Sequence, residues 1–311
     1  MKKVNCILCG GDENIIIDEH LEDKYYSQLN KKPPHSIKTV ICKKCGFVYS
    51  NPQIEEKDKR DLYSKKYRPI SAEEYYKKDY MKREIIRWKI NWIKNFLKKI
   101  EEKTKLPKIL DIGSAGGHLL YLFKLRGWET LGIEPTKEYA KYSIKKFKLK
   151  ITRKFFEDAK LPNNFFDLVV LANVLEHFSD PNFALKKIHE KLKGGGLLFV
   201  IVPNILKPIG KVTDYFRSEH ISYFSEKTLV AIAKKNGFGL LKINSKHYIR
   251  ALFIKDEKIR KGEIKYNIEN PSRIIRIIET YKKRYKVREY LRNILIKLKL
   301  IFLIKIYRKI I

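Results

Sequence analysis

The stretch that decides the fold covers residues 107–120 and reads PKILDIGSAGGHLL. A short apolar run at residues 109–112 leads into five small residues, and a helical pattern begins at His118. A turn of small residues between a strand and a helix brings backbone amides close to a bound ligand. The stretch therefore predicts the first strand of an α/β sheet, with a ligand at the turn that follows it.

The same strand–helix alternation continues along the chain. Strands are expected at residues 109–112, 130–134, 168–172, 197–202, 240–244 and 251–254. Helices are expected at residues 118–126, 137–146, 182–192 and 226–236. The last two strands have no helix between them, which indicates a final hairpin. The pattern predicts an open, doubly wound α/β sheet of parallel strands that ends in this hairpin.

The residues around the turn narrow the choice of ligand. Asp111 lies two residues before Gly113, and a carboxylate there disfavours a pyrophosphate. The dinucleotide spacing G-x-G-x-x-G is not met, because Ala115 and His118 occupy its second and third glycine positions. S-adenosylmethionine fits better, since it carries a sulfonium and an ammonium group. Glu134, at the end of the second strand, can accept both ribose hydroxyls, although dehydrogenases share this feature.

Residues 156–159, FEDA, precede Leu161-Pro162 near the expected end of the third strand. We interpret Asp158, in preference to Glu157, as the acceptor for an adenine amino group. A neighbouring backbone amide, at Ala159, would then bind the adenine ring nitrogen. The alternative is that both acids are solvated residues of a loop.

These motifs, together with FDLVVLANVLEH at residues 166–177, resemble class I S-adenosylmethionine-dependent methyltransferases. The resemblance covers residues 106–255, and the usual third glycine is Ala115 here. It implies a Rossmann-like, doubly wound sheet of seven strands with a final antiparallel strand, and S-adenosylmethionine as cofactor. It also implies a set of binding residues: Asp111, Gly113, Ser114, Ala115, Gly117, Glu134, Asp158, Ala159 and Asn173.

All cysteines lie in two C-x2-C pairs, Cys6 with Cys9 and Cys42 with Cys45. Four thiolates satisfy a tetrahedral Zn²⁺ ion with no open position, so the predicted zinc is structural. Redox pairs and idle thiols are the alternatives. The segment ICKKCGFVYSNP at residues 41–52, followed by Tyr63 and Tyr67, resembles the zinc-binding domain of one methyltransferase subgroup. That subgroup includes C-methyltransferases of nucleotide-linked deoxysugars, which implies a nucleotide- or lipid-linked sugar substrate in glycan or polysaccharide biosynthesis.

Two Glu-His pairs are candidates for catalysis, because histidine titrates near neutral pH. Glu176-His177 follows the fourth strand, where it could equally only pack the loop. Glu219-His220 matches part of a Tyr-x-Glu-His segment that supplies the base in the resembling sugar enzymes. Arg217 stands at the tyrosine position and could instead bind a substrate phosphate or carboxylate. We predict His220, Glu219 and His177 as catalytic residues and leave open which histidine is the base.

The chain divides into four expected parts. They are a zinc-binding domain at residues 1–52, a helical connector at 53–105, the methyltransferase core at 106–255 and a basic helical tail at 256–311. Two short strands are expected in the first part, at residues 39–41 and 47–49. A broad apolar stripe between residues 85 and 100 predicts a buried helix in the connector.

The net charge of +33 indicates an anionic partner, although lysine-rich genomes and heat adaptation also produce such a charge. An RNA methyltransferase is therefore the alternative function, with nucleic acid the less favoured partner. Residues 291–311 contain no acid, which predicts peripheral contact with an anionic membrane; a tail packed on the core is the alternative. Because the sequence shows no signal peptide and no spanning segment, we expect a cytoplasmic protein.

Overall fold

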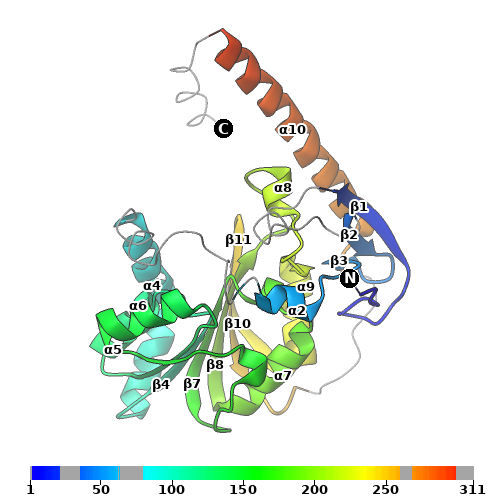
Figure 1. The fold of residues 1–311 in the computed structure, drawn as a ribbon. Coiled ribbons are helices and arrows are strands. Elements are labelled where there is room, and N and C mark those ends of the chain that lie inside the picture. Colours follow the sequence, from blue (N-terminus) through cyan, green and yellow to red (C-terminus); the bar gives the residue numbers. More distant parts are fainter. Residues whose placement is uncertain (1, 22–35, 62, 64–79, 260–267, 299–311) are drawn as a thin grey trace.

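The computed structural model describes residues 2–21, 36–61, 63, 80–259 and 268–298, and for residues 80–89 it describes the backbone only. The strands form two sheets, one of seven strands and one of four. Figure 1 shows the larger sheet in the body of the molecule and the smaller one beside its upper edge.

The larger sheet has the strand order β10-β11-β8-β7-β4-β5-β6. Its strands are β4 (Lys108–Ile112), β5 (Glu129–Ile133), β6 (Lys150–Thr152), β7 (Phe166–Ala172), β8 (Leu192–Pro203), β10 (Phe238–Ser245) and β11 (Tyr248–Lys255). β4 to β8 run parallel, and β11 pairs antiparallel with both β8 and β10. The predicted seven-stranded sheet with its final antiparallel strand is confirmed.

Helices cover both faces of this sheet, as Figure 1 shows. One face carries α4 (Tyr80–Lys103), α5 (His118–Leu125) and α6 (Lys137–Phe147), and the other carries α7 (Pro181–Lys191) and α9 (Glu226–Lys235). The strands are nearly continuous apolar runs because a parallel sheet is buried on both sides. Of the apolar stripe predicted for α4, Ile90, Ile93 and Leu97 are buried; the side chains of residues 85, 86 and 88 lie outside the described part.

The smaller sheet has the order β1-β2-β3-β9. Three of its strands come from the N-terminal part: β1 (Asn14–His20), β2 (Ile37–Cys42) and β3 (Val48–Ser50). The fourth, β9 (Ser222–Tyr223), comes from the core and pairs antiparallel with β3. β2 and β3 match the two strands predicted at 39–41 and 47–49, whereas β1 and β9 were not predicted. The N-terminal unit is thus joined to the core by strand pairing.

The remaining elements lie around the upper edge of the larger sheet. They are the helices α2 (Glu56–Asp61), α8 (Val212–Tyr215) and α10 (Pro271–Lys297) and the 3-10 turns η2 (Phe156–Asp158) and η3 (Leu175–His177). α10 begins at Asn270, whose side chain accepts a hydrogen bond from the Arg273 amide, and it extends away from the body (Figure 1). Among the described helices, none combines the length and apolar character needed to cross a membrane.

Candidate active site

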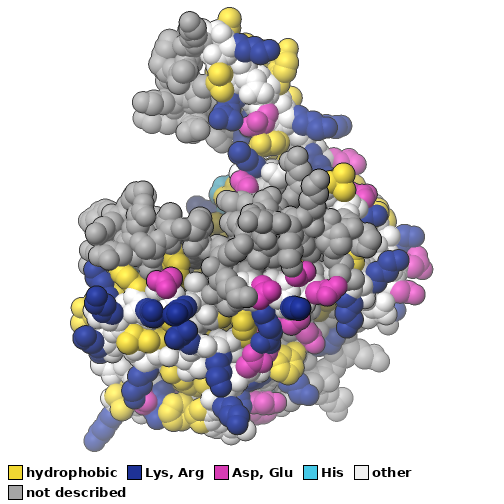
Figure 2. Space-filling view, in the orientation of Figure 1, with side chains coloured by type: hydrophobic (Ala, Val, Ile, Leu, Met, Phe, Trp, Pro, Cys, Tyr) yellow, Lys and Arg dark blue, Asp and Glu magenta, His cyan; other side chains and the backbone are white. Residues whose placement is uncertain are grey.

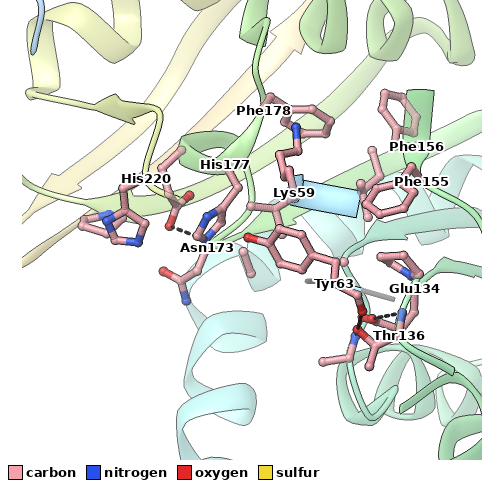
Figure 3. Close-up of a pocket in the computed structure, with 18 of the residues that line it drawn as sticks. Lys59, Tyr63, Glu134, Thr136, Phe155, Phe156, Asn173, His177, Phe178 and His220 are labelled. Atoms are coloured by element: carbon pink, nitrogen blue, oxygen red, sulfur yellow. Dashed lines mark hydrogen bonds and ion pairs between the residues drawn. The ribbon is translucent and has the colours of Figure 1, made fainter. Parts of the chain in front are cut away.

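A cavity of about 430 Å³ opens at the carboxyl ends of the parallel strands. Ile112, Ile133, Ala172 and Pro203 end or follow four neighbouring strands and all line it. This edge is where open α/β sheets bind their ligands. Figure 3 shows the two parts of the cavity that we distinguish below. The turn end is formed by Gly113, Ala115, Glu134, Thr136 and Phe155, and the histidine end by His177, Tyr215, Arg217 and His220.

Glu134 is fixed at the turn end by two backbone amides. Its Oε2 accepts from the Ala115 amide at 2.8 Å, and its Oε1 accepts from the Thr136 amide at 2.9 Å. The side chain is buried yet lines the cavity. A carboxylate can accept about four hydrogen bonds, so these two position it without exhausting its capacity for ligand hydroxyls.

The glycine turn itself is held in left-handed backbone conformations. Gly113 has φ +72°, and a Cβ atom there would lie 2.5 Å from Cγ2 of Val174. Ala115 also has a positive φ, 47°, which is uncommon for a residue with a side chain. Glycine at residue 113 is therefore required both by the backbone conformation and by the close packing of Val174, while Gly113 and Ala115 both line the cavity.

The connector also contributes to the turn end. The Tyr63 carbonyl accepts from Oγ1 of Thr136 at 3.0 Å. The Tyr63 ring makes edge contacts with Phe155 and with His177, at centroid distances of 6.5 Å and 6.0 Å. Tyr63 therefore lies between the two ends of the cavity, as Figure 3 shows.

His177 has a defined tautomer at the histidine end. Its Nδ1 lies 2.8 Å from the carbonyl oxygen of Glu219. A carbonyl can only accept, so Nδ1 carries the proton and Nε2 carries the lone pair. Burial, with a contribution from Arg217, lowers the pKa of His177 to about 3. The ring is therefore neutral at neutral pH, with its basic nitrogen in the cavity wall.

His220 has the opposite tautomer. Nε and Nη2 of Arg217 lie 3.2 Å and 2.9 Å from its Nε2, and a guanidinium can only donate. Nε2 of His220 is therefore an acceptor already engaged by Arg217, which also pairs with Glu219 at 3.1 Å. Burial lowers the pKa of His220 well below its ordinary value. Both rings are thus neutral, and they meet edge to face at 4.9 Å.

Glu176 is buried next to the two histidines and also lines the cavity. Its Oε1 is 4.0 Å from Nε2 of His177, and its Oε2 has no hydrogen-bond partner within the described part of the chain. Burial raises the pKa of Glu176 to about 8, so the carboxyl is mostly protonated at neutral pH. Glu176, His177 and His220 could in principle hold a metal ion, since their ligand atoms lie within 4.8 Å of one another. The Arg217 guanidinium on His220 opposes a cation there.

The segment that carries His220 is anchored to the N-terminal sheet. Oγ of Ser50, in β3, donates to the His220 carbonyl at 2.7 Å, and the Ser50 amide donates to the Ile221 carbonyl at 3.0 Å. The Ile221 amide donates in turn to the carbonyl of Glu176 at 2.8 Å. The N-terminal unit thus holds the backbone of His220 directly, and Ile221 links that segment to the backbone of Glu176.

A family model described as a methyltransferase domain matches residues 79–243. The chain belongs to this methyltransferase family. It is also similar to the ubiquinone biosynthesis O-methyltransferase of Pelagibacter ubique (strain HTCC1062), with 30% identity over 182 residues. That alignment covers 51% of this chain and 73% of the relative. The protein is therefore an S-adenosylmethionine-dependent methyltransferase.

Solved structures of S-adenosylmethionine-dependent methyltransferases are similar to about half of this methyltransferase. One from Mesorhizobium loti has a TM-score of 0.43 and 13% identity, and covers 48% of this chain and 91% of its own. One from Aquifex aeolicus has a TM-score of 0.40 and 20% identity, and covers 51% of this chain and 88% of its own.

The structure places some of the predicted cofactor residues on the cavity wall and others behind it. Gly113, Ala115, Glu134 and Asn173 line the cavity of the methyltransferase. Asp111 and Ser114 are buried and are not among the lining residues. Gly117 has a packing role, since a Cβ there would lie 2.6 Å from Cδ1 of Leu149. Cofactor contact by the residues behind the wall stays a prediction.

The two residues predicted to contact adenine have other partners in this structure. Asp158 is about half exposed, forms an ion pair with Arg60 of α2 and is not among the lining residues, whereas Glu157 is. The Ala159 amide donates to the Phe156 carbonyl at 3.2 Å within the 3-10 turn, so it is engaged locally. Adenine contact by Asp158 and Ala159 stays a prediction, and nothing in the sequence indicated Arg60, which comes from a segment 98 residues away.

Among the predicted catalytic residues, His177 and His220 both line the cavity and Glu219 does not. The Glu219 carboxylate binds Arg217, so a direct role for Glu219 stays a prediction. Arg217 lines the cavity with its guanidinium held by Glu219 and His220, and its binding of a substrate anion also stays a prediction. Of the two histidines predicted to be catalytic, His177 is the one whose imidazole lone pair does not face the Arg217 guanidinium.

The four cysteines come together as predicted. Sγ of Cys6 lies 3.5 Å from that of Cys45, Sγ of Cys9 lies 3.6 Å from that of Cys42, and the ligand atoms of all four lie within 4.8 Å of one another. Sulfurs bound at about 2.3 Å around a tetrahedral ion lie roughly 3.8 Å apart. The thiol cluster therefore has the dimensions of a zinc site.

Sequence reasoning missed several lining residues. Lys59 and Tyr63 come from the connector, and Ile209, Asp214, Tyr215 and Tyr248 come from segments around β8, α8 and β11. For Tyr63 a signal existed, since it lies in the segment that resembles the zinc-domain subgroup. For the others the sequence offered none, because neither their spacing nor their residue type marks a site.

Proposed function

We propose that this methyltransferase methylates a hydroxyl group of a small molecule, with His177 as the general base. The observation that carries the proposal is the tautomer of His177, whose Nδ1 donates to the Glu219 carbonyl and leaves Nε2 as a base in the cavity wall. The similar ubiquinone biosynthesis enzyme is named an O-methyltransferase, which supports oxygen as the acceptor atom.

The turn end fits the cofactor. Glu134 would hold the ribose hydroxyls, and the turn at Gly113 and Ala115, which lines the cavity, would lie against the rest of the nucleoside and amino-acid moieties. When bound, S-adenosylmethionine supplies a methyl group on a sulfonium, which is already a good leaving group. The chain's own task is to orient the acceptor and remove its proton.

Proton removal would take place at Nε2 of His177. The proton of the acceptor hydroxyl moves to this nitrogen as the oxygen becomes the nucleophile. The imidazolium that forms lies 4.0 Å from Oε1 of Glu176, whose carboxyl can then ionise and release a proton toward solvent. The two groups therefore act as a coupled pair, and a carboxylate beside His177 would raise the basicity of the ring.

For the acceptor we propose a sugar-type compound linked to a nucleotide or a lipid. The support comes from the cysteine unit and its resemblance to the subgroup that includes sugar methyltransferases. The cavity gives further support, because three histidines, four tyrosines and Asp214 are among the residues that line it, and such side chains hydrogen-bond hydroxyl groups. Its volume lies near the low end for ligand sites, so the acceptor group itself would be small.

For the cysteines we propose one structural Zn²⁺ ion, bound by Cys6, Cys9, Cys42 and Cys45 as thiolates. The spacing of the sulfurs supports it. With all four positions taken by protein, the ion would stabilise the N-terminal sheet rather than take part in the reaction.

The test is turnover with labelled cofactor on pools of nucleotide-linked sugars, lipid-linked glycans, phenols and RNA. We compare the wild type with His177→Asn, because asparagine keeps a donor for the Glu219 carbonyl but has no Nε2. If His177 is the base, the variant loses about 10²–10⁴ in kcat while its cofactor affinity changes little.

Two results would overturn the proposal. Full turnover by His177→Asn would show that the histidine only positions the neighbouring segment. Methylation of RNA alone, with strong salt dependence, would replace the small-molecule acceptor with nucleic acid.

A further inference from the structure

The two halves of α10 have different surroundings. Near its start, Ile274 and Ile278 are buried against the N-terminal sheet and α8. Nζ of Lys282 lies 2.5 Å from Oδ1 of Asp18 and donates to the Ile17 carbonyl at 2.7 Å. We call residues 283–298 the α10 tip. Figure 1 shows this part of the helix leaving the body of the molecule.

The α10 tip exposes an apolar stripe. Val287, Leu291, Ile294 and Leu298 follow the i, i+4, i+7, i+11 spacing of one helix face, with Tyr290 at its edge. Val287 is 58% exposed, Leu291 39% and Leu298 61%. At 100° per residue, this face is turned by roughly 140° from the face that carries Ile274 and Ile278. The stripe is therefore not a continuation of the surface that packs on the body.

The charges of the α10 tip are almost all positive. It contains six basic residues, Lys283, Arg284, Lys286, Arg288, Arg292 and Lys297, and one acid, Glu289. Figure 2 shows basic side chains beside hydrophobic ones over this projecting part. A second copy of the tip packed on the stripe would bring like charges together, and the whole chain already carries a net charge of +33. An anionic membrane surface can pair with the basic residues and, at the same contact, bury the apolar stripe.

We propose that the α10 tip binds the surface of an anionic membrane, with the Val287–Leu291–Ile294–Leu298 stripe inserted at the headgroup boundary and the basic residues on lipid phosphates. Such a contact goes beyond methyl transfer. It would also bring the membrane near the cavity, because the Tyr281 hydroxyl donates to the Gly210 carbonyl at 3.0 Å and the neighbouring Ile209 lines the cavity.

The experiment is flotation of the full, metal-loaded chain with vesicles of phosphatidylcholine alone or mixed with phosphatidylglycerol. The chain should float only with the mixed vesicles and dissociate as salt is raised. Val287→Glu with Leu291→Glu should weaken partition on the order of tenfold or more. The matched control is Asn293→Glu with Ile296→Glu, which adds the same charge on the opposite side and should weaken partition less.

Calorimetric binding of S-adenosylmethionine should be equal in all these variants, because the α10 tip does not line the cavity; this shows that each variant is folded. The proposal is overturned if the chain ignores anionic vesicles. It is also overturned if both double variants lose partition equally, because the added negative charge would then explain the loss without insertion of the stripe. A concentration-dependent dimer abolished by the stripe variant would assign the face to a second copy, and RNA binding without vesicle binding would assign it to nucleic acid.

Discussion

The turn end and the histidine end of the cavity are built by different means. The turn end is local: Gly113, Ala115 and Glu134 follow adjacent parallel strands, and backbone amides fix the carboxylate. The histidine end is assembled from η3, the segment before β9 and the N-terminal sheet, which are far apart in sequence. The cofactor site can therefore persist through many sequence changes, whereas the acceptor site depends on contacts between distant segments.

The largest effect is expected for Glu134→Ala at the turn end. The change removes the carboxylate proposed to hold the ribose and leaves the Ala115 and Thr136 amides without this acceptor. Two charge-assisted hydrogen bonds are worth about 1.5–3 kcal/mol each, so S-adenosylmethionine affinity should fall by about 10²–10⁴ in calorimetry. Glu129→Ala is the control and should bind normally, because Glu129 lies at the other end of β5, is partly exposed and pairs with Lys108. Near-normal binding of S-adenosylmethionine by Glu134→Ala would show that the turn end does not hold the ribose through this carboxylate.

Metal removal should affect the histidine end more than the turn end. Chelation or Cys42→Ser would release the proposed zinc ion, loosen β3 and so free the segment held by Ser50. Turnover should fall on the order of tenfold or more, while cofactor affinity changes by less than about threefold. Ser50→Ala is the milder counterpart, since it removes one buried hydrogen bond worth about 1 kcal/mol and leaves the cysteines intact. If chelation reduced turnover and cofactor affinity equally, the N-terminal unit would support both ends of the cavity, which would contradict this prediction.

A smaller, pH-dependent effect is expected from Glu176. Its folded pKa, about 8, lies above the ordinary value of 4.5, so the folded state holds a proton that the unfolded state releases. The contribution of this carboxyl to stability is therefore full below pH 4.5 and declines as the pH rises toward 8. Glu176→Gln removes this pH-dependent decrease in the free energy of unfolding, which amounts to at most about 1.4 kcal/mol per pH unit.

Urea unfolding at pH 5 and pH 8 measures this effect. The variant should gain stability relative to the wild type as the pH rises. His177→Asn should behave in the opposite sense on the acid side, because the pKa of His177 is lowered and its contribution is lost as the pH falls below 6.5 toward 3. Parallel curves for the wild type and both variants would show that neither group titrates differently in the folded state.

The smallest effect is expected for Tyr63→Leu, at the boundary between the ends. The variant loses the edge contacts with Phe155 and His177 and keeps an apolar side chain. Aromatic pairs contribute about 0.5–1.5 kcal/mol, so the KM values for cofactor and acceptor should both rise a few-fold. A rise in only one of them would assign Tyr63 to that end alone.

The fold could be predicted where the deciding contacts are local. The turn after β4, the alternation of strands and helices and the final hairpin all follow from short-range pattern. β9 could not be predicted, because two residues become a strand only when β3 lies beside them. The ion pair of Asp158 could not be predicted for a similar reason, since Arg60 lies 98 residues away in the sequence. The histidine pairs were visible in the sequence, but the orientation of each ring depends on its partners, Glu219 for His177 and Arg217 for His220.

The pairing of β3 with β9 has a consequence for chimeric enzymes. The region that matches the methyltransferase family begins at residue 79, so a junction there would seem natural for exchanging N-terminal units between relatives. Such a chimera would set a foreign strand against Ser222–Tyr223 and could displace His220, even with every residue of the core unchanged. Residues 48–50 and 220–223 must therefore be transferred together, and a library that recombines them as one block should yield active hybrids more often.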